Sequence, residues 1–221
     1  SCSSAGRNLS RGTRLLKYNV LILGASYGSL FGTKLLMAGH SVALVCTKPT
    51  AELINNDGTV VRFPIRGRDS LVEISSKGLP GNLSATTPDD VDPGKFDLIV
   101  LGMQEAQYGS PGVKELMDRV GASHVPCLAI MNMPPLTYLK RFPGLDDGSL
   151  RSSYTDTSVW DAFDPALMTL CSPDPQSFRP PDKKINVLQF GLPTNAKAAR
   201  FESDEHTAIP VAYPHLTPPP K

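Results

Sequence analysis

The run from Asn19 to Cys46, NVLILGASYGSLFGTKLLMAGHSVALVC, constrains the fold of this chain more than any other segment. Val20–Leu23 is a short apolar run typical of a buried strand, and after a glycine the apolar residues recur at helical spacing. Gly39 ends that helix, and Ser41–Cys46 forms a second apolar strand. A strand, a glycine turn, a helix and another strand make the βαβ unit with which dinucleotide-binding domains begin.

The same alternation continues along the chain and predicts the fold class. PTAELINNDG and GVKELMDRVG are expected helices, Leu98–Leu101 and PCLAIMNM are expected buried strands, and Thr59–Ser75 has β-rich runs typical of a hairpin. Strands that alternate with helices indicate an α/β protein with a Rossmann-like, doubly wound, mostly parallel sheet.

Composition divides the chain into three expected regions. Residues 1–17 contain serine and basic residues but no acid, which favours a disordered leader. Residues 18–143 form the expected dinucleotide-binding Rossmann domain. Residues 144–221 are proline-rich, and we interpret them as an incomplete second domain or a tail, with a short helix expected around Ala162–Leu170 and a strand in INVLQF.

Charge and cysteine spacing exclude several classes of function. The formal net charge is +1, so we expect no nucleic-acid partner, and no segment is long and apolar enough to predict a membrane span. The four cysteines form no C-x-x-C pair and no histidine completes a zinc site, so we expect no metal. These features favour a reducing, cytoplasmic compartment. Whether the protein forms a homodimer is left open.

The glycine turn GASYGSLFG departs from the usual G-x-G-x-x-G pattern, and it can be aligned in three ways, of which the second is rejected. In the strict pattern Gly24, Ser26 and Ser29 take the glycine positions, and two side chains intrude where a pyrophosphate needs space. A short-chain dehydrogenase pattern would use Gly24, Gly28 and Gly32, but no tyrosine has the lysine four residues later that this family needs. In the third alignment the glycine loop is one residue shorter than usual, and GSLFG (Gly28–Gly32) anchors the helix. A βαβ crossover that uses glycine only for packing is the alternative to all three.

With the third alignment the sequence resembles the ketopantoate reductase family of NADP-dependent 2-oxo-acid reductases. The resemblance rests on GASYGSLFG, AGH, VALV, the hairpin after NNDG, TTPDDVDPGKFDLIVLGM and MNM, in that order from Tyr18 to Phe142. It implies that the turn holds a dinucleotide at the start of the helix, where unpaired amide groups suit a phosphate. The expected cofactor-binding residues of this turn are Gly24, Ala25, Ser26, Tyr27, Gly28 and Ser29.

The second strand ends in CTK and carries no acid for the ribose hydroxyls, so NADP is expected rather than NAD. The family tends to have an arginine at the position of Thr47, and Lys48 is the candidate to take its role beside a 2′-phosphate. A solvated surface lysine is the alternative for Lys48.

The resemblance also marks two positions near the nicotinamide end. Met103 and Gln104 lie in the loop where the family has a lysine, and a glutamine brings no charge to attract a substrate carboxylate. Asn132 of MNM matches the family's QNG asparagine and is the one candidate catalytic residue, with a helix N-cap as its alternative role. The general acid stays unknown, because Lys183, Lys184 and Lys197 match no family motif.

These expectations together describe an NADPH-dependent oxidoreductase that reduces a small 2-oxo acid or related carbonyl. The alternative is a dinucleotide-binding or interaction protein of the same fold that has lost catalysis, which the missing acid and the shortened turn favour. Fold-level analogy does not decide between the two.

Overall fold

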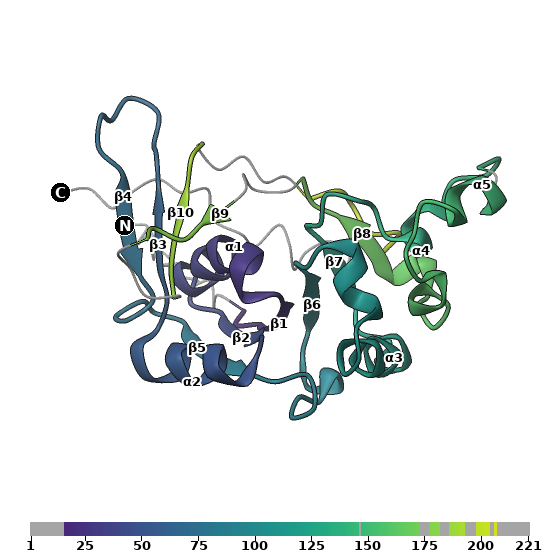
Figure 1. Ribbon diagram of the computed structural model, residues 1–221, viewed down its shortest axis with the longest axis horizontal. Coiled ribbons are helices and arrows are strands. Elements are labelled where there is room, and N and C mark those ends of the chain that lie inside the picture. The colour runs from purple at the N-terminus through teal and green to yellow at the C-terminus, as the bar shows by residue number, and fades with distance from the viewer. Residues whose placement is uncertain are drawn as a thin grey trace, which may run out of the picture.

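The larger of two sheets has the strand order of a doubly wound nucleotide-binding fold. The computed structural model describes residues 16–145, 147–172, 177–181, 186–192, 198–203 and 206, so the expected leader lies almost entirely outside it. Six parallel strands pair in the order β5-β2-β1-β6-β7-β8 (Figure 1). Their bounds are β1 Asn19–Leu23, β2 Ser41–Val45, β5 Asn82–Thr86, β6 Leu98–Leu101, β7 Cys127–Ala129 and β8 Met168–Leu170. This order reverses between β1 and β6, where ligands of open α/β sheets bind. The predicted fold class is confirmed.

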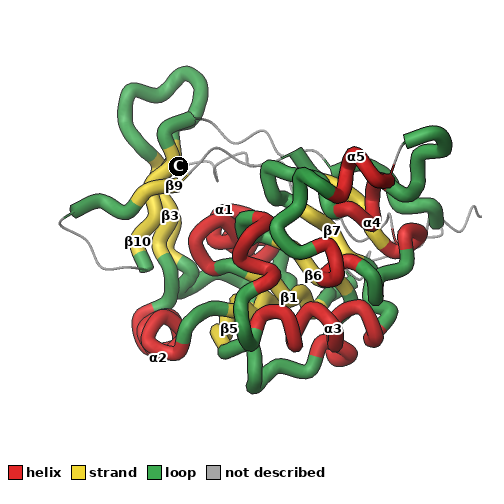
Figure 2. Tube along the Cα trace, turned by 45° about the vertical axis from the view of Figure 1, so that its right-hand side comes forward, coloured by secondary structure: helices red, strands yellow, loops and turns green. Residues whose placement is uncertain are grey.

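Helices cover both faces of this sheet because its central strands β1 and β6 are apolar and buried at every position after Asn19. In β1, Val20 and Ile22 pack in one cluster with α1 (Ala25–Met37) and α2 (Lys48–Asp57). Leu21 and Leu23 point the other way, into a cluster with α3 (Val113–Ser123) and the buried Tyr108 and Trp160. Helices α1 and α3 therefore lie on opposite sides of β1 (Figure 2). Burial on both faces explains why β1 reads as a continuous apolar run rather than an alternating one.

A second, four-stranded sheet packs against the outer side of α1. It has the order β4-β3-β10-β9, and the expected hairpin is confirmed as the antiparallel pair β3–β4. The bounds are β3 Val60–Phe63, β4 Val72–Ser75, β9 Ser177–Phe178 and β10 Val187–Phe190. Leu30 of α1 joins the buried core of this sheet, whereas Phe31 faces the large sheet. Helix α1 is thus enclosed between two sheets, which its nearly all-round apolar sequence requires.

Residues after 143 add strands to both sheets. The helix expected around Ala162–Leu170 is wrong apart from one 3-10 turn, Pro165–Leu167, because Met168–Leu170 forms β8 and pairs in parallel with β7. Pairing with a buried strand overrides the local helical pattern here. The strand expected in INVLQF is confirmed as β10. Two short helices, α4 (Leu136–Leu139) and α5 (Asp147–Arg151), connect β7 to this part of the chain.

Candidate functional site

Gly24 sits where three strands of the large sheet end, and its neighbours leave no room for a side chain. Its φ is +106°, and its backbone N–H donates to the carbonyl of Val45 at the end of β2 (3.1 Å). A Cβ on Gly24 would lie 2.6 Å from the carbonyl oxygen of Gly102, just past β6. Glycine is therefore needed at the first position of the turn for both conformation and space.

The GSLFG segment anchors α1 to the sheet, as the third alignment of the turn predicts. A Cβ on Gly28 would lie 2.3 Å from Cγ2 of Ile22, and one on Gly32 would lie 3.3 Å from Cδ1 of the same residue. Ser29 is buried, and its hydroxyl donates to the carbonyl of Ala25 within the helix. Gly28 and Ser29 thus hold the helix in place and do not line the cleft described next.

An open cleft of about 900 Å³ lies at the carboxyl ends of β1, β2 and β6, around the first turn of α1. Seven of the expected cofactor-binding residues line it: Gly24, Ala25, Ser26, Tyr27, Thr47, Met103 and Gln104. Lining residues that the sequence analysis did not include are Val45, Cys46, Thr50, Pro88, Gly102, Ala106, Gln107, Ser110, Pro111, Val113, Ser177 and Arg179. The structure therefore brings most of the expected turn residues together around one space.

The second strand leads to the far end of this cleft. Thr47 is the N-cap residue of α2, and its Oγ1 lies 3.0 Å from Oγ1 of Thr50 in the first turn of that helix. Both threonines line the cleft. Lys48 is the first residue of α2, is exposed, and is not among the lining residues. Two helix N-termini, those of α1 and α2, therefore border the same space, and each carries partial positive charge.

The lining of the cleft contains no carboxylate, and Arg179 is its only charged residue among those described. Cys46 is half-buried there, and burial raises the pKa of its thiol to about 11. The thiol is thus protonated near neutral pH and adds no negative charge. The electrostatic character of the cleft favours an anionic ligand.

A smaller cavity of about 300 Å³ adjoins the cleft and shares three residues with it. Its lining residues are Tyr27, Met103, Gln104, Glu105, Met131, Asn132 and Met133. The Tyr27 hydroxyl donates to Oδ1 of Asn132 (3.3 Å), which joins the first turn of α1 to the loop after β7. The alternative role of Asn132 as a helix N-cap is wrong, because α4 begins at Leu136, four residues past it, and Pro135 takes the N-cap position.

Hydrogen bonds with Tyr108 and Thr155 hold the loop after β6 in place. The backbone N–H of Met103 donates to the hydroxyl of buried Tyr108 (3.0 Å), and burial raises the pKa of that tyrosine. Glu105, in the 3-10 helix η2 (Glu105–Gly109), accepts hydrogen bonds from the backbone N–H of Thr155 (3.1 Å) and from its hydroxyl (2.8 Å). Gln104 is therefore held at the junction of the two cavities.

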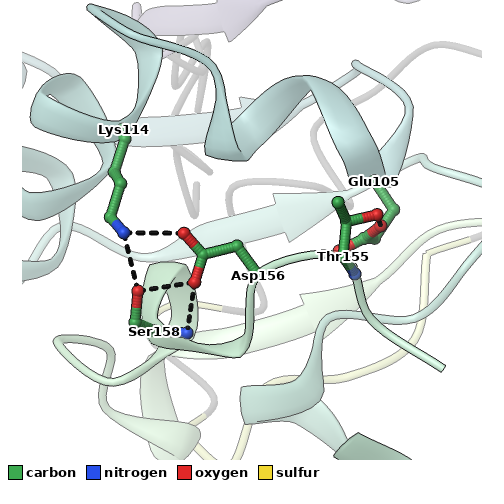
Figure 3. A network of polar contacts seen from close by, with 5 residues as sticks. All are labelled: Glu105, Lys114, Thr155, Asp156 and Ser158. Carbon is green, nitrogen blue, oxygen red and sulfur yellow. Dashed lines mark hydrogen bonds and ion pairs between the residues drawn. The ribbon is translucent and has the colours of Figure 1, made fainter. Parts of the chain in front are cut away.

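A neighbouring network attaches the segment around Thr155 to α3 (Figure 3). The Lys114 ammonium donates to Oδ2 of Asp156 (2.6 Å) and to the hydroxyl of Ser158 (2.8 Å). The hydrogen bond from Lys114, and after it those that the Ser158 hydroxyl (2.6 Å) and backbone N–H (3.0 Å) donate to Oδ1, lower the pKa of the Asp156 carboxyl to about 2. The hydrogen bond between Lys114 and Asp156 also raises the pKa of Lys114. The network thus supports the η2 loop that borders both cavities.

Among the described residues that line the two cavities, no lysine or histidine takes the place of the missing general acid. Lys183, Lys184 and Lys197 lie outside the described residues. In the part of the chain that the structure describes, no group of three or more histidine, cysteine, aspartate or glutamate residues is placed to hold a metal ion. Over the same residues, no helix has the length and apolar character that crossing a bilayer requires.

Comparison with solved structures gives several matches of the same fold. A protein assigned as a ketopantoate reductase from Ralstonia solanacearum has a TM-score of 0.61 at 15% identity, over 89% of this chain and 57% of its own. One assigned as a 2-dehydropantoate 2-reductase from Bacillus subtilis has a TM-score of 0.51 at 17% identity, over 86% and 53% of the two chains. A D-sorbitol dehydrogenase has a TM-score of 0.50 at 10% identity, over 87% and 53%.

These likenesses confirm the Rossmann-like fold and do not by themselves assign an activity. The chain spans little more than half the length of each of these three proteins. No protein-family model matches the sequence, and no curated protein matches it.

Proposed function

We propose that the cleft binds a nicotinamide dinucleotide and that this chain is the cofactor-binding part of an oxidoreductase. The observation that carries the proposal is the position of the cleft. It opens at the point where the strand order reverses, and the first turn of α1 lines it. The amide groups of a helix N-terminus in this position suit a pyrophosphate. An acid-free lining adds support, because a carboxylate would repel that group.

We propose NADP rather than NAD as the dinucleotide. No acid follows β2 to accept hydrogen bonds from ribose hydroxyls. The region after β2 instead offers the hydroxyls of Thr47 and Thr50, the N-terminus of α2, and Lys48 beside them. All of these groups favour a 2′-phosphate. Lys48 does not line the cleft itself, so we expect it to act through charge at the rim.

We further propose that the smaller cavity receives a small 2-oxo acid or related carbonyl. Support comes from two structural neighbours, which are assigned as a ketopantoate reductase and a 2-dehydropantoate 2-reductase. A bound nicotinamide would supply the hydride for such a reduction. The amide of Asn132 and the side chain of Gln104 would orient the substrate carbonyl, and apolar Met131 and Met133 would limit water in the cavity.

One observation favours a second candidate function, dinucleotide binding without catalysis. The smaller cavity is lined by no described lysine or histidine, and both oxygens of its one carboxylate, Glu105, accept hydrogen bonds from Thr155. Apart from the Tyr27 hydroxyl, which donates to Oδ1 of Asn132 (3.3 Å), no proton donor for the substrate is then evident in that lining. The two candidate functions share the cofactor site, and they differ only in whether the protein catalyses a reduction.

Titration of the purified chain with NADPH and with NADH, followed by fluorescence, tests the shared site. We expect NADPH to bind more tightly than NADH. Lys48→Ala should weaken NADPH about two- to fivefold, since an exposed charge contributes little, and should leave NADH unchanged. Lys77→Ala, an exposed lysine outside both cavities, is the matched control.

The outcomes separate the proposal from its alternatives. Binding of neither dinucleotide would overturn the proposed site. Equal binding of the two would overturn the preference for NADP. Once binding is established, consumption of NADPH with a panel of 2-oxo acids would favour the reductase, and its absence would favour the binding protein.

A further inference from the structure

The second sheet reaches the start of α1, where the proposed dinucleotide binds. Leu30 in the second turn of α1 packs against Val61, Phe63, Leu188 and Phe190 of this sheet. Strand β9 is the edge strand, antiparallel to β10, and Figure 1 draws both strands alongside α1. A buried core thus fixes the sheet relative to the helix, and the position of β9 follows from that packing.

The contact between β9 and the turn is made by two serines. Oγ of Ser177 lies 3.4 Å from Oγ of Ser26, and the Ser177 hydroxyl is 3.5 Å from the carbonyl oxygen of Ser26. These residues are 151 positions apart in the sequence. Both line the cleft, so β9 forms part of its wall at the N-terminus of α1.

Arg179 follows β9 directly and lines the same cleft. It is exposed, and it is the only charged side chain among the described lining residues. In extended backbone two residues span about 7 Å, a distance that an arginine side chain can cover. Arg179 therefore stands within reach of the groups around Ser26.

We propose that Arg179 binds the pyrophosphate of the dinucleotide, so that the second sheet supplies a phosphate ligand to the large one. This inference rests on the proposed function of the cleft. Its guanidinium would donate to phosphate oxygens on the side facing away from the helix amides, and would add a full charge to their partial charge. The hydroxyls of Ser26 and Ser177 would border the same group.

The pyrophosphate, and not the 2′-phosphate, is the group that the geometry favours. Ser177 places the strand beside Ser26 at the start of α1, which is the pyrophosphate position of this fold. The 2′-phosphate is expected at the end of β2, near Thr47. NAD and NADP carry the same pyrophosphate, so an arginine bound to it would raise the affinity for both and would not change the preference between them.

The test compares Arg179→Met with wild type in titrations with NADH, NADPH and ADP-ribose, which carries the pyrophosphate without the nicotinamide. We expect each of the three to bind about tenfold more weakly to the variant, with the ratio of NADPH to NADH affinity unchanged. Arg179→Lys should recover part of the loss. Arg68→Met, an exposed arginine on the loop between β3 and β4, is the matched control and should bind all three like wild type.

Each contrary outcome points to a different failure. Unchanged binding in Arg179→Met would overturn the inference and leave the proposed function standing. A loss confined to NADPH would overturn it too, because it would assign Arg179 to the 2′-phosphate. Wild-type protein that binds none of the three ligands would overturn the proposed function first. Urea midpoints equal to that of wild type establish that the variants are folded.

Discussion

Substitution of Gly24 by alanine should destabilise the fold through a clash that the sequence alone does not reveal. A positive φ costs a non-glycine residue about 1–2 kcal/mol. The added Cβ would lie 2.6 Å from the carbonyl oxygen and 2.9 Å from the carbonyl carbon of Gly102, and these backbone atoms are held because Gly102 N–H donates to Leu23. Overpacking of this kind costs about 1–3 kcal/mol. Lower entropy of the unfolded chain offsets about 0.4–1 kcal/mol, so we expect a net loss of about 1–4.5 kcal/mol.

Gly39→Ala is the matched control for this prediction. Gly39 also has a positive φ, +89°, but no atom lies within 4 Å of the Cβ that alanine would add. It should therefore cost only about 0.5–1.5 kcal/mol, the conformational part. Urea unfolding followed by circular dichroism gives both free energies, provided that the slope of the transition is unchanged. Losses within about 0.5 kcal/mol of each other would refute the argument from close approach.

Two further predictions concern titratable groups. The pKa of the Asp156 carboxyl is lowered to about 2, so its contribution to stability is complete above the ordinary value near 4 and is lost as the pH falls from about 4 to 2. The stability difference between wild type and Asp156→Asn should shrink over that range in acid unfolding, and a constant difference would contradict the role of Lys114. Burial raises the pKa of Cys46 from 9.0 to about 11, so iodoacetamide at pH 8 should modify it about a hundredfold more slowly than a thiol of ordinary pKa. Peptide mapping measures this rate, and modification as fast as that of a free thiol would refute the burial.

The fold was predictable from the sequence where local pattern and tertiary environment agree. The strands of the βαβ unit are short apolar runs buried on both faces, and α1 is apolar because two sheets enclose it. Strand β8 was missed because its three residues, Met168–Leu170, lie in a sequence with helical spacing and become a strand only beside β7. Register with a distant partner leaves little trace in a short segment.

The candidate site was predictable in part for the same reason. Ser26 and Tyr27 follow a strand directly, so their position at the helix start is a local property. Ser177 and Arg179 reach the cleft only through the pairing of β9 with β10, which itself joins β3. No sequence motif marks such a contact, because it depends on two successive strand pairings, and one of them, β10 with β3, joins segments far apart in the chain.

The shortened turn and the second sheet are two parts of one arrangement. Gly28 supplies the close contact with Ile22 that draws α1 onto the large sheet, and Ser29 turns its hydroxyl back into the helix. Ser29, which takes the third glycine position of the usual motif, does not line the cleft, so a glycine is not needed there to leave room for a ligand. The hydroxyl of Ser26 instead faces β9, so one wall of the cleft comes from residues that a motif search does not see. A pyrophosphate in this cleft would be bound from two sheets, and loss of the Arg179 guanidinium should therefore weaken it even though every residue of the glycine turn is intact.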